Sequence, residues 1–117
     1  MPRPRIDKYV DNETGTLTVP ASSTEDTDWP VIPDGEEWIV DRFGVRIPEG
    51  ARVELQVRFA TGPVRFRTLR VIHGPGSWDG DPCVNLVGDG TAKLRVQRVN
   101  ESGSPQDIYL WVEGPKR

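Results

Sequence analysis

Proline and glycine interrupt this chain at short intervals along its whole length, and they constrain its fold more than any other feature. Eleven prolines and twelve glycines among 117 residues leave few stretches long enough for a helix. No such stretch carries apolar residues at helical spacing. A chain of this length can nevertheless bury a core of its own. The sequence therefore predicts one domain built from short strands and turns.

The clearest strand signal lies in residues 52–59, where Val53, Leu55, Val57 and Phe59 alternate with polar side chains. Such alternation is typical of a strand with one face on a core and the other in water. The same reasoning predicts further strands at residues 16–19, 38–47, 64–72, 84–87, 92–99 and 108–112. About seven to eight short antiparallel strands of this kind predict an all-β sandwich or jelly roll.

Details of two strands are also predicted. The strand at 38–47 is expected to pair with the next one through Pro48-Glu49-Gly50, because proline presets φ and glycine accepts a positive φ. Gly44 within it is expected to mark a bulge or a close approach of another group. In the strand at 64–72 the apolar phase changes between Phe66 and Leu69, which predicts a bulge or a bend between sheets.

Residues 1–30 differ from the rest of the chain. They are polar, and they contain the run Ser22-Ser23-Thr24-Glu25-Asp26-Thr27-Asp28. This composition predicts an extended N-terminal arm, with one short strand at 16–19, followed by a β-sandwich domain over residues 31–117.

Charge is also divided unevenly along the chain. Residues 1–41 carry ten acidic and three basic side chains, whereas residues 42–117 carry eight acidic and twelve basic ones. Opposite charges predict that the acidic segment lies over a basic face of its own domain or of a neighbouring subunit. A merely solvated surface is the alternative.

Residues that carry catalytic chemistry are scarce. The one histidine, His73, has no signature that links it to a serine or cysteine nucleophile. The one cysteine, Cys83, cannot form an intrachain disulfide, and its position before an apolar strand predicts a small buried side chain. We therefore expect a protein that is not an enzyme, with no catalytic residues and no cofactor.

Three aspartates in glycine-rich segments offer oxygen ligands. Asp79, Asp81 and Asp89 have the right chemistry for calcium, but their spacing is not that of an EF-hand loop. Aspartates that hydrogen-bond their own backbone in turns are the other interpretation. The second interpretation is favoured, so no metal site is expected.

The chain has four tryptophans. Trp78 lies in a glycine-rich segment expected to be a loop, where its ring would pack on the domain, join a protein interface or form a platform for carbohydrate. In the last strand, Tyr109 and Trp111 share one face, and Ile108 and Leu110 share the other. Both faces of that strand are therefore expected to be covered.

Two partner classes are not expected. The net charge is −3, and arginines that alternate along strands do not form the continuous basic track that nucleic acid requires. No run of about eighteen apolar residues indicates a membrane span. The polar residues after the start do not resemble a signal peptide, so a cytoplasm-like compartment is expected.

Four segments carry a resemblance to a known class of proteins. They are IPDGEEW at 32–38, PEGARVEL at 48–55, LRVQRVN at 94–100 and YLWVEG at 109–114. In strand order and turn style they resemble small β-sandwich structural proteins of tailed bacteriophages, in particular capsid decoration or cement proteins. The resemblance implies a virion protein made in the host cytoplasm. It also implies a homo-oligomer, with a trimer favoured, that bridges subunits of the major capsid protein.

A phage tail-associated or receptor-binding adhesion module is the alternative function, and a carbohydrate-binding β-sandwich module is a second alternative. Arginine outnumbers lysine twelve to three, which suits bidentate contacts at interfaces. The residues expected at a protein interface are Arg3, Arg5, Tyr9, Trp29, Arg65, Arg67, Trp78, Tyr109 and Trp111.

Overall fold

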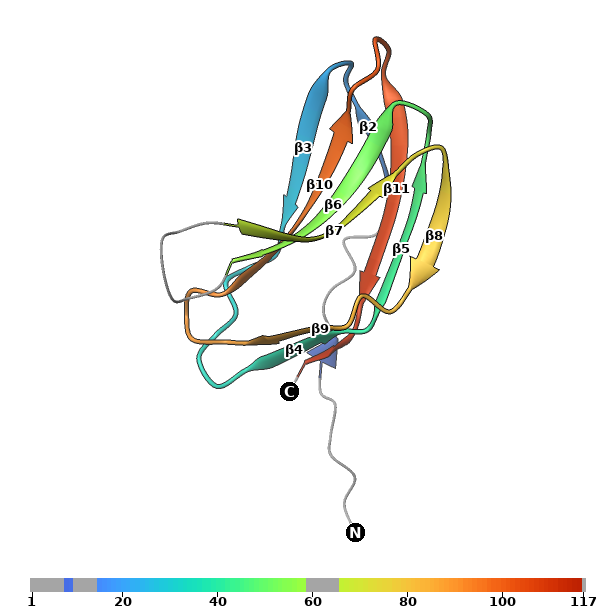
Figure 1. Ribbon diagram of the computed structural model, residues 1–117. Coiled ribbons are helices and arrows are strands. Elements are labelled where there is room, and N and C mark those ends of the chain that lie inside the picture. The colour runs from blue at the N-terminus through green and yellow to red at the C-terminus, as the bar shows by residue number, and fades with distance from the viewer. Residues whose placement is uncertain (1–7, 10–14, 59–65, 117) are drawn as a thin grey trace.

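The computed structural model describes residues 8–9, 15–58 and 66–116, which form twelve β-strands. Eight of these strands make two four-stranded antiparallel sheets that face each other (Figure 1). The first sheet has the order β3-β10-β6-β7 and consists of Ser23–Asp28, Lys93–Asn100, Ala51–Arg58 and Phe66–His73. The second has the order β2-β11-β5-β8 and consists of Gly15–Val19, Gln106–Glu113, Arg42–Ile47 and Gly76–Gly80. The expected all-β sandwich is confirmed.

The strand order is that of a jelly roll. Strands at matching positions in the two sheets are consecutive in the chain: β3 with β2, β10 with β11, β6 with β5, and β7 with β8. The chain therefore crosses from one sheet to the other at each of these four connections, as in an eight-stranded jelly roll. All four crossings lie at the same end of the sandwich, at the top of Figure 1.

A third sheet lies across the opposite end of the sandwich (Figure 1). Its order is β1-β12-β4-β9, from Lys8–Tyr9, Pro115–Lys116, Glu37–Val40 and Val84–Val87. These four strands raise the total to twelve, above the seven to eight expected from sequence. The two-residue strands β1 and β12 are too short to show any alternation, so the sequence pattern does not reveal them.

Apolar side chains fill the space between the two main sheets. Val53, Leu55 and Val57 of β6 are fully buried, as their alternation predicts. Ile108, Leu110 and Val112 of β11 face them from the second sheet and are also fully buried. Each such side chain contributes about 1.5–3 kcal/mol when it leaves water, so this layer is the main source of the domain's stability.

The predicted boundary at residue 30 is wrong. The short strand at 16–19 is confirmed as part of β2, but the acidic run after it forms β3, which pairs with β10 from Asp28↔Arg95 to Ser23↔Asn100. Trp29 follows β3 and is only 2% exposed. Residues 15–30 therefore belong to the sandwich, and the part of the predicted arm before them lies largely outside the described residues.

The expected single strand at 38–47 is also wrong. It divides at Asp41 into β4 of the third sheet and β5 of the second, and Asp41 N donates to Glu113 O at 3.2 Å. Gly50 has the predicted positive φ, 81°, but the turn leads from β5 into the other sheet instead of joining a paired hairpin. The predicted positive φ of Gly50 is confirmed, whereas the predicted pairing of β5 with β6 is wrong.

The expected bulge in β7 is confirmed. Leu55 pairs with Arg70 and Gln56 pairs with Thr68, which leaves Leu69 as the extra residue between them. β7 pairs with β6 alone among the described strands, so it is an edge strand. A bulge interrupts the hydrogen-bond ladder at such an edge and opposes pairing with a further strand.

Candidate binding surfaces

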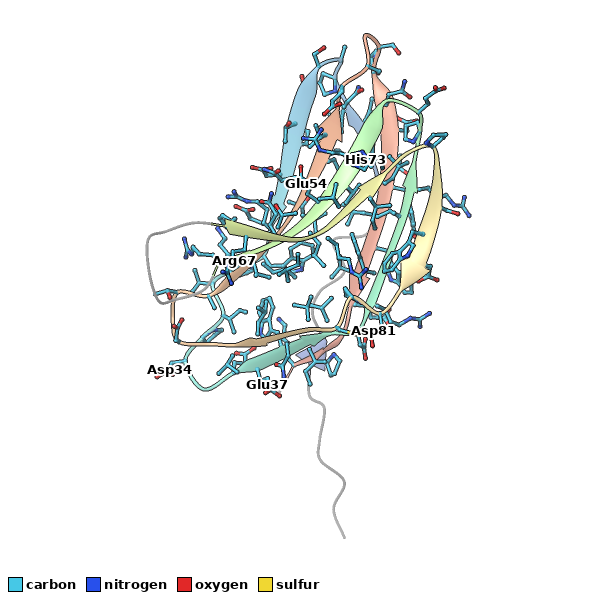
Figure 2. The ribbon with its side chains drawn as sticks, in the orientation of Figure 1. Asp34, Glu37, Glu54, Arg67, His73 and Asp81 are labelled. Carbon is cyan, nitrogen blue, oxygen red and sulfur yellow. The ribbon has the colours of Figure 1, made fainter. Side chains whose placement is uncertain are left out.

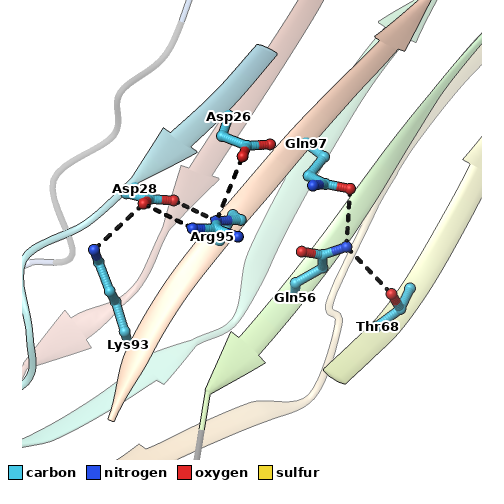
Figure 3. Close-up of polar contacts among 7 residues, drawn as sticks. All are labelled: Asp26, Asp28, Gln56, Thr68, Lys93, Arg95 and Gln97. Carbon is cyan, nitrogen blue, oxygen red and sulfur yellow. Dashed lines mark hydrogen bonds and ion pairs between the residues drawn. The ribbon is translucent and has the colours of Figure 1, made fainter. Parts of the chain in front are cut away.

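The outer face of the sheet β3-β10-β6-β7 carries a network of charged side chains (Figure 3). Arg95 of β10 donates to both carboxylate oxygens of Asp28 of β3, at 2.6 and 3.1 Å, and lies 3.9 Å from Asp26. Lys93 Nζ lies 3.3 Å from the same Asp28 carboxylate. The hydrogen bond from Arg95 holds the pKa of Asp28 below its ordinary value. The acidic segment thus lies on a basic strand of its own domain, as one of the sequence interpretations proposed.

Amide and hydroxyl groups continue this network across the sheet (Figure 3). Gln56, only 8% exposed, donates to Gln97 Oε1 at 3.0 Å and to Thr68 Oγ1 at 3.3 Å. Thr68 in turn donates to Glu54 at 3.2 Å. Glu54 also accepts from Arg52 at 2.9 Å. Most polar groups on this face are therefore satisfied by their neighbours, which fixes the strands relative to one another.

The edge strand β7 is different, because most of its side chains are exposed. Arg67, Leu69, Arg70 and Val71 are all exposed, with Leu69 at 42% and Val71 at 46%. We call these four residues the β7 margin. Figure 2 shows Arg67 and His73 at opposite ends of this strand. The margin combines two guanidinium groups with two exposed apolar side chains.

Trp78 lies beneath the β7 margin. The prediction that this residue lies in a loop is wrong. It belongs to β8, is partly buried, and packs edge to face on Phe43 with ring centroids 5.9 Å apart. The Arg70 guanidinium lies 5.5 Å from the centroid of the Trp78 ring. Packing against the core is thus the role the structure assigns to Trp78, and the ring supports Arg70 from below.

The outer face of the sheet β2-β11-β5-β8 brings together two predicted interface residues. Tyr109 and Trp111 lie on this face, opposite Arg46 and Gly44 of β5. A Cβ at Gly44 would lie 3.0 Å from Trp111 Cε3, so the missing side chain lets the indole lie against the strand. The Arg42 guanidinium lies 4.6 Å from the indole centroid. Gly44 is therefore a point of close approach, as expected.

A shallow groove of about 470 Å³ lies on this face, near the end of the sandwich where the chain crosses between the two sheets. It is lined by Arg46, Ile47, Pro48, Gly76, Ser77 and Asp107. The residues come from β5, from the turn after it, from β8 and from β11. Nothing in the sequence pattern indicated this groove, because only the pairing of β5 with both β8 and β11 brings its walls together.

The remaining predicted interface residues lie elsewhere. Trp29 is a core residue, so its prediction as an interface residue is wrong: a side chain that is 2% exposed cannot reach a partner. The backbone of Tyr9 lies in β1 opposite Pro115, and its side chain is not among the described groups. Arg3, Arg5 and Arg65 lie outside the described residues.

His73 and Cys83, the two residues considered for nucleophilic chemistry, are both exposed and belong to different parts of the fold. His73 ends β7 opposite Arg52. Cys83 precedes β9 and is exposed, so the prediction that it is buried is wrong. It adopts a positive φ of 56°, a turn conformation that points its side chain outward while the neighbouring Pro82 is buried. Asp81 Oδ1 accepts a hydrogen bond from Cys83 N at 2.7 Å.

The aspartates behave as turn formers. Asp89 accepts hydrogen bonds from Thr91 N at 2.8 Å and from Ala92 N at 3.0 Å, and the bond from Thr91 N lowers its pKa from the ordinary value. Asp81 caps its own turn, as described above, and Asp79 lies in β8 opposite Gly44. Asp81 and Asp89 therefore confirm the turn interpretation. In the described ranges, no three histidine, cysteine, aspartate or glutamate side chains gather closely enough to hold a metal ion.

Comparison of the chain with protein-family models, with curated proteins and with solved structures finds no match in any of the three. Within the described residues there is no helix with the length and apolarity that crossing a membrane requires. The assignment of a role therefore rests on the surfaces of the jelly roll themselves.

Proposed function

We propose that this chain is a non-enzymatic assembly protein that attaches through the β7 margin to an acidic surface of a larger protein shell. The observation that carries the proposal is the composition of that margin: Arg67 and Arg70 alternate with the exposed apolar Leu69 and Val71. Arginine is enriched among the residues that contribute most to protein interfaces, and Leu69 and Val71 add apolar surface that a partner can bury.

The bulge at Leu69 favours attachment by side chains over attachment by an added strand. A partner strand would need an unbroken ladder of backbone groups along β7, and the extra residue interrupts it. The guanidinium of Arg70 is held over Trp78, which limits the rotamer freedom that binding would otherwise remove. The margin is thus preorganised to meet a carboxylate-rich surface.

The virion shell is the specific partner that the sequence resemblance suggests, with the major capsid protein as its building block. Jelly rolls serve both as viral structural domains and as lectins, so the fold is compatible with this role but does not single it out. A ligand that binds only the assembled shell stabilises it by its own binding free energy. Self-association into a trimer would add avidity to each weak contact.

The test is co-sedimentation of the purified chain with assembled virion shells through a sucrose cushion, at increasing sodium chloride concentrations. We expect the wild-type chain to pellet with shells and to be released as salt screens the arginines. The Arg67→Glu and Arg67→Glu/Arg70→Glu variants should remain in the supernatant. Arg42→Glu, a charge reversal on the opposite sheet, is the matched control and should pellet like the wild type.

Circular dichroism and tryptophan fluorescence establish that each variant is folded before it is compared. A wild-type chain that never pellets with shells would contradict the proposal. So would a folded double variant that pellets as well as the wild type. Analytical ultracentrifugation of the free chain and of the double variant measures self-association separately from attachment to shells.

A further inference from the structure

We infer that the groove between β5, β8 and β11 is a binding site for a pyranose sugar, independent of the proposed attachment to a protein shell. Its walls are built on the neighbouring strands β8, β5 and β11 (Figure 1). Ser77 of β8 lies opposite Arg46 of β5, and Arg46 lies opposite Tyr109 of β11. Asp107 lies two residues before Tyr109 on the same face. The site is therefore positioned by the sheet and not by a loop.

The charged groups of the groove are the first argument for a ligand. Arg46 and Asp107 both line it, yet in the part of the chain that the structure describes no ion pair involves either of them. Asp107 Oδ1 accepts a hydrogen bond from Thr18 Oγ1 at 2.5 Å, which fixes the carboxylate and leaves its other oxygen available. A donor and an acceptor thus face the same space with room between them.

The aromatic ring beside the groove is the second argument. Tyr109 is 37% exposed and is the cross-strand neighbour of Arg46, so its side chain stands within about 5 Å of that of Arg46 at the Cβ atoms. An exposed aromatic ring offers an apolar face together with a polar tip. Tyr109 is not one of the residues that line the groove, but it neighbours Arg46, which does line it.

A pyranose matches both features. Its ring presents a patch of C–H groups that stacks on an aromatic face, and its hydroxyl groups act at once as donors and acceptors. One pair of neighbouring hydroxyls can accept from Arg46 and donate to Asp107, while Ser77 offers a hydroxyl that does either. A groove of about 470 Å³ lies within the range of small-molecule sites and has room for one or two sugar rings.

The test is titration of the isotopically labelled chain with the methyl glycosides of glucose, galactose and N-acetylglucosamine, followed in amide NMR spectra. We expect at least one glycoside to bind in the millimolar range, with shifts centred on Arg46, Ser77, Asp107 and Tyr109. Tyr109→Thr should weaken that binding about tenfold, which corresponds to the loss of about 1.4 kcal/mol. Arg46→Met and Asp107→Asn should each weaken it as well.

Val87→Thr is the matched control, because Val87 is exposed on β9 of the third sheet and its replacement leaves the groove intact. Sodium acetate and guanidinium chloride are titrated in parallel as probes for a simple ion site. If neither the sugars nor the ions bind, the inference is overturned. Shifts caused equally by the two ions, or sugar shifts centred away from the groove, also overturn it.

Discussion

The guanidinium of Arg95 donates two hydrogen bonds to the carboxylate of Asp28 and thereby fastens β10 to β3 (Figure 3). This contact matters because β3 has no apolar residue in its sequence, Ser23–Asp28. On the inner side, buried Arg98 adds a hydrogen bond to Thr27 Oγ1 at 3.0 Å and one to Ile108 O at 3.1 Å. The edge strand is thus held by backbone pairing and charge instead of apolar burial.

Replacement of Asp28 by Asn should destabilise the domain, because it removes the charge that pairs with Arg95 and Lys93. The pair is partly exposed and screened by water, so we expect a loss of about 0.5–1 kcal/mol in the free energy of unfolding. Urea denaturation at neutral pH measures it. Asp26→Asn is the control and should cost less, since Asp26 lies 3.9 Å from Arg95. Equal losses in the two variants would contradict this role of Asp28.

The same contact predicts a pH dependence. The pKa of Asp28 is lower in the folded chain than in the unfolded one, chiefly because of the hydrogen bond from Arg95. The contribution of this pair is therefore fully present above the ordinary aspartate pKa and is lost as the pH falls through the lowered value. Urea denaturation of wild type and Asp28→Asn in an acid pH series should show their stabilities converging at low pH. A difference that stays constant would contradict the linkage.

Asn100 should be among the most sensitive polar positions in the domain. Its buried side-chain amide donates to Val19 O, Pro20 O and Ser104 O at 3.0, 3.2 and 2.9 Å, and its Oδ1 accepts from Ser102 N at 2.9 Å. Asn100→Ala removes these hydrogen bonds, including the buried one to Val19 O, so we expect a loss of about 2–3 kcal/mol. Chemical denaturation measures it, and Asn85→Ala at an exposed position should be nearly neutral.

Gly88 should not tolerate a side chain. A Cβ there would lie 1.9 Å from the backbone oxygen of Pro33, and Gly88 N donates to Glu36 O at 2.7 Å in the same contact. Gly88→Ala therefore forces the backbone apart, with an expected loss of about 2–3 kcal/mol in thermal or chemical unfolding. Gly103→Ala has open space around its Cβ and serves as the control. Similar stabilities for the two variants would show that this end of the fold can relax.

Cys83 should react with a maleimide in the folded chain, because its side chain is exposed. Mass spectrometry after brief labelling without denaturant measures the reaction. Cys83→Ser should change the free energy of unfolding by less than about 0.5 kcal/mol, as expected for an exposed position. Protection of the thiol until the chain is unfolded would contradict its exposure.

The sequence predicted those parts of the fold in which the local pattern of apolar and polar side chains matches their burial or their turn geometry. Alternation in β6 and β11 identified the residues that face the core, since successive side chains of a strand point to opposite sides. The phase change near Leu69 predicted the bulge, and the proline and glycine around Glu49 predicted the positive φ of Gly50. Alternation in β10 also places Arg98 on the inner face beside Leu94 and Val96, a position that the sequence prediction did not include.

The tertiary structure alone decided which strands pair and where the surfaces lie. Any residue can offer backbone hydrogen bonds, so the polar run Ser23–Asp28 became a strand only because β10 presents an open edge and opposite charges. Trp78 is held in a strand because β8 pairs with β5, and the groove at Arg46 and Asp107 exists because β5 pairs with β8 and β11 together. These pairings join residues far apart in the chain, and their energy depends on packing and charge across strands. No local pattern of side chains encodes such contacts, and for that reason the class of fold was readable from sequence whereas the binding surfaces were not.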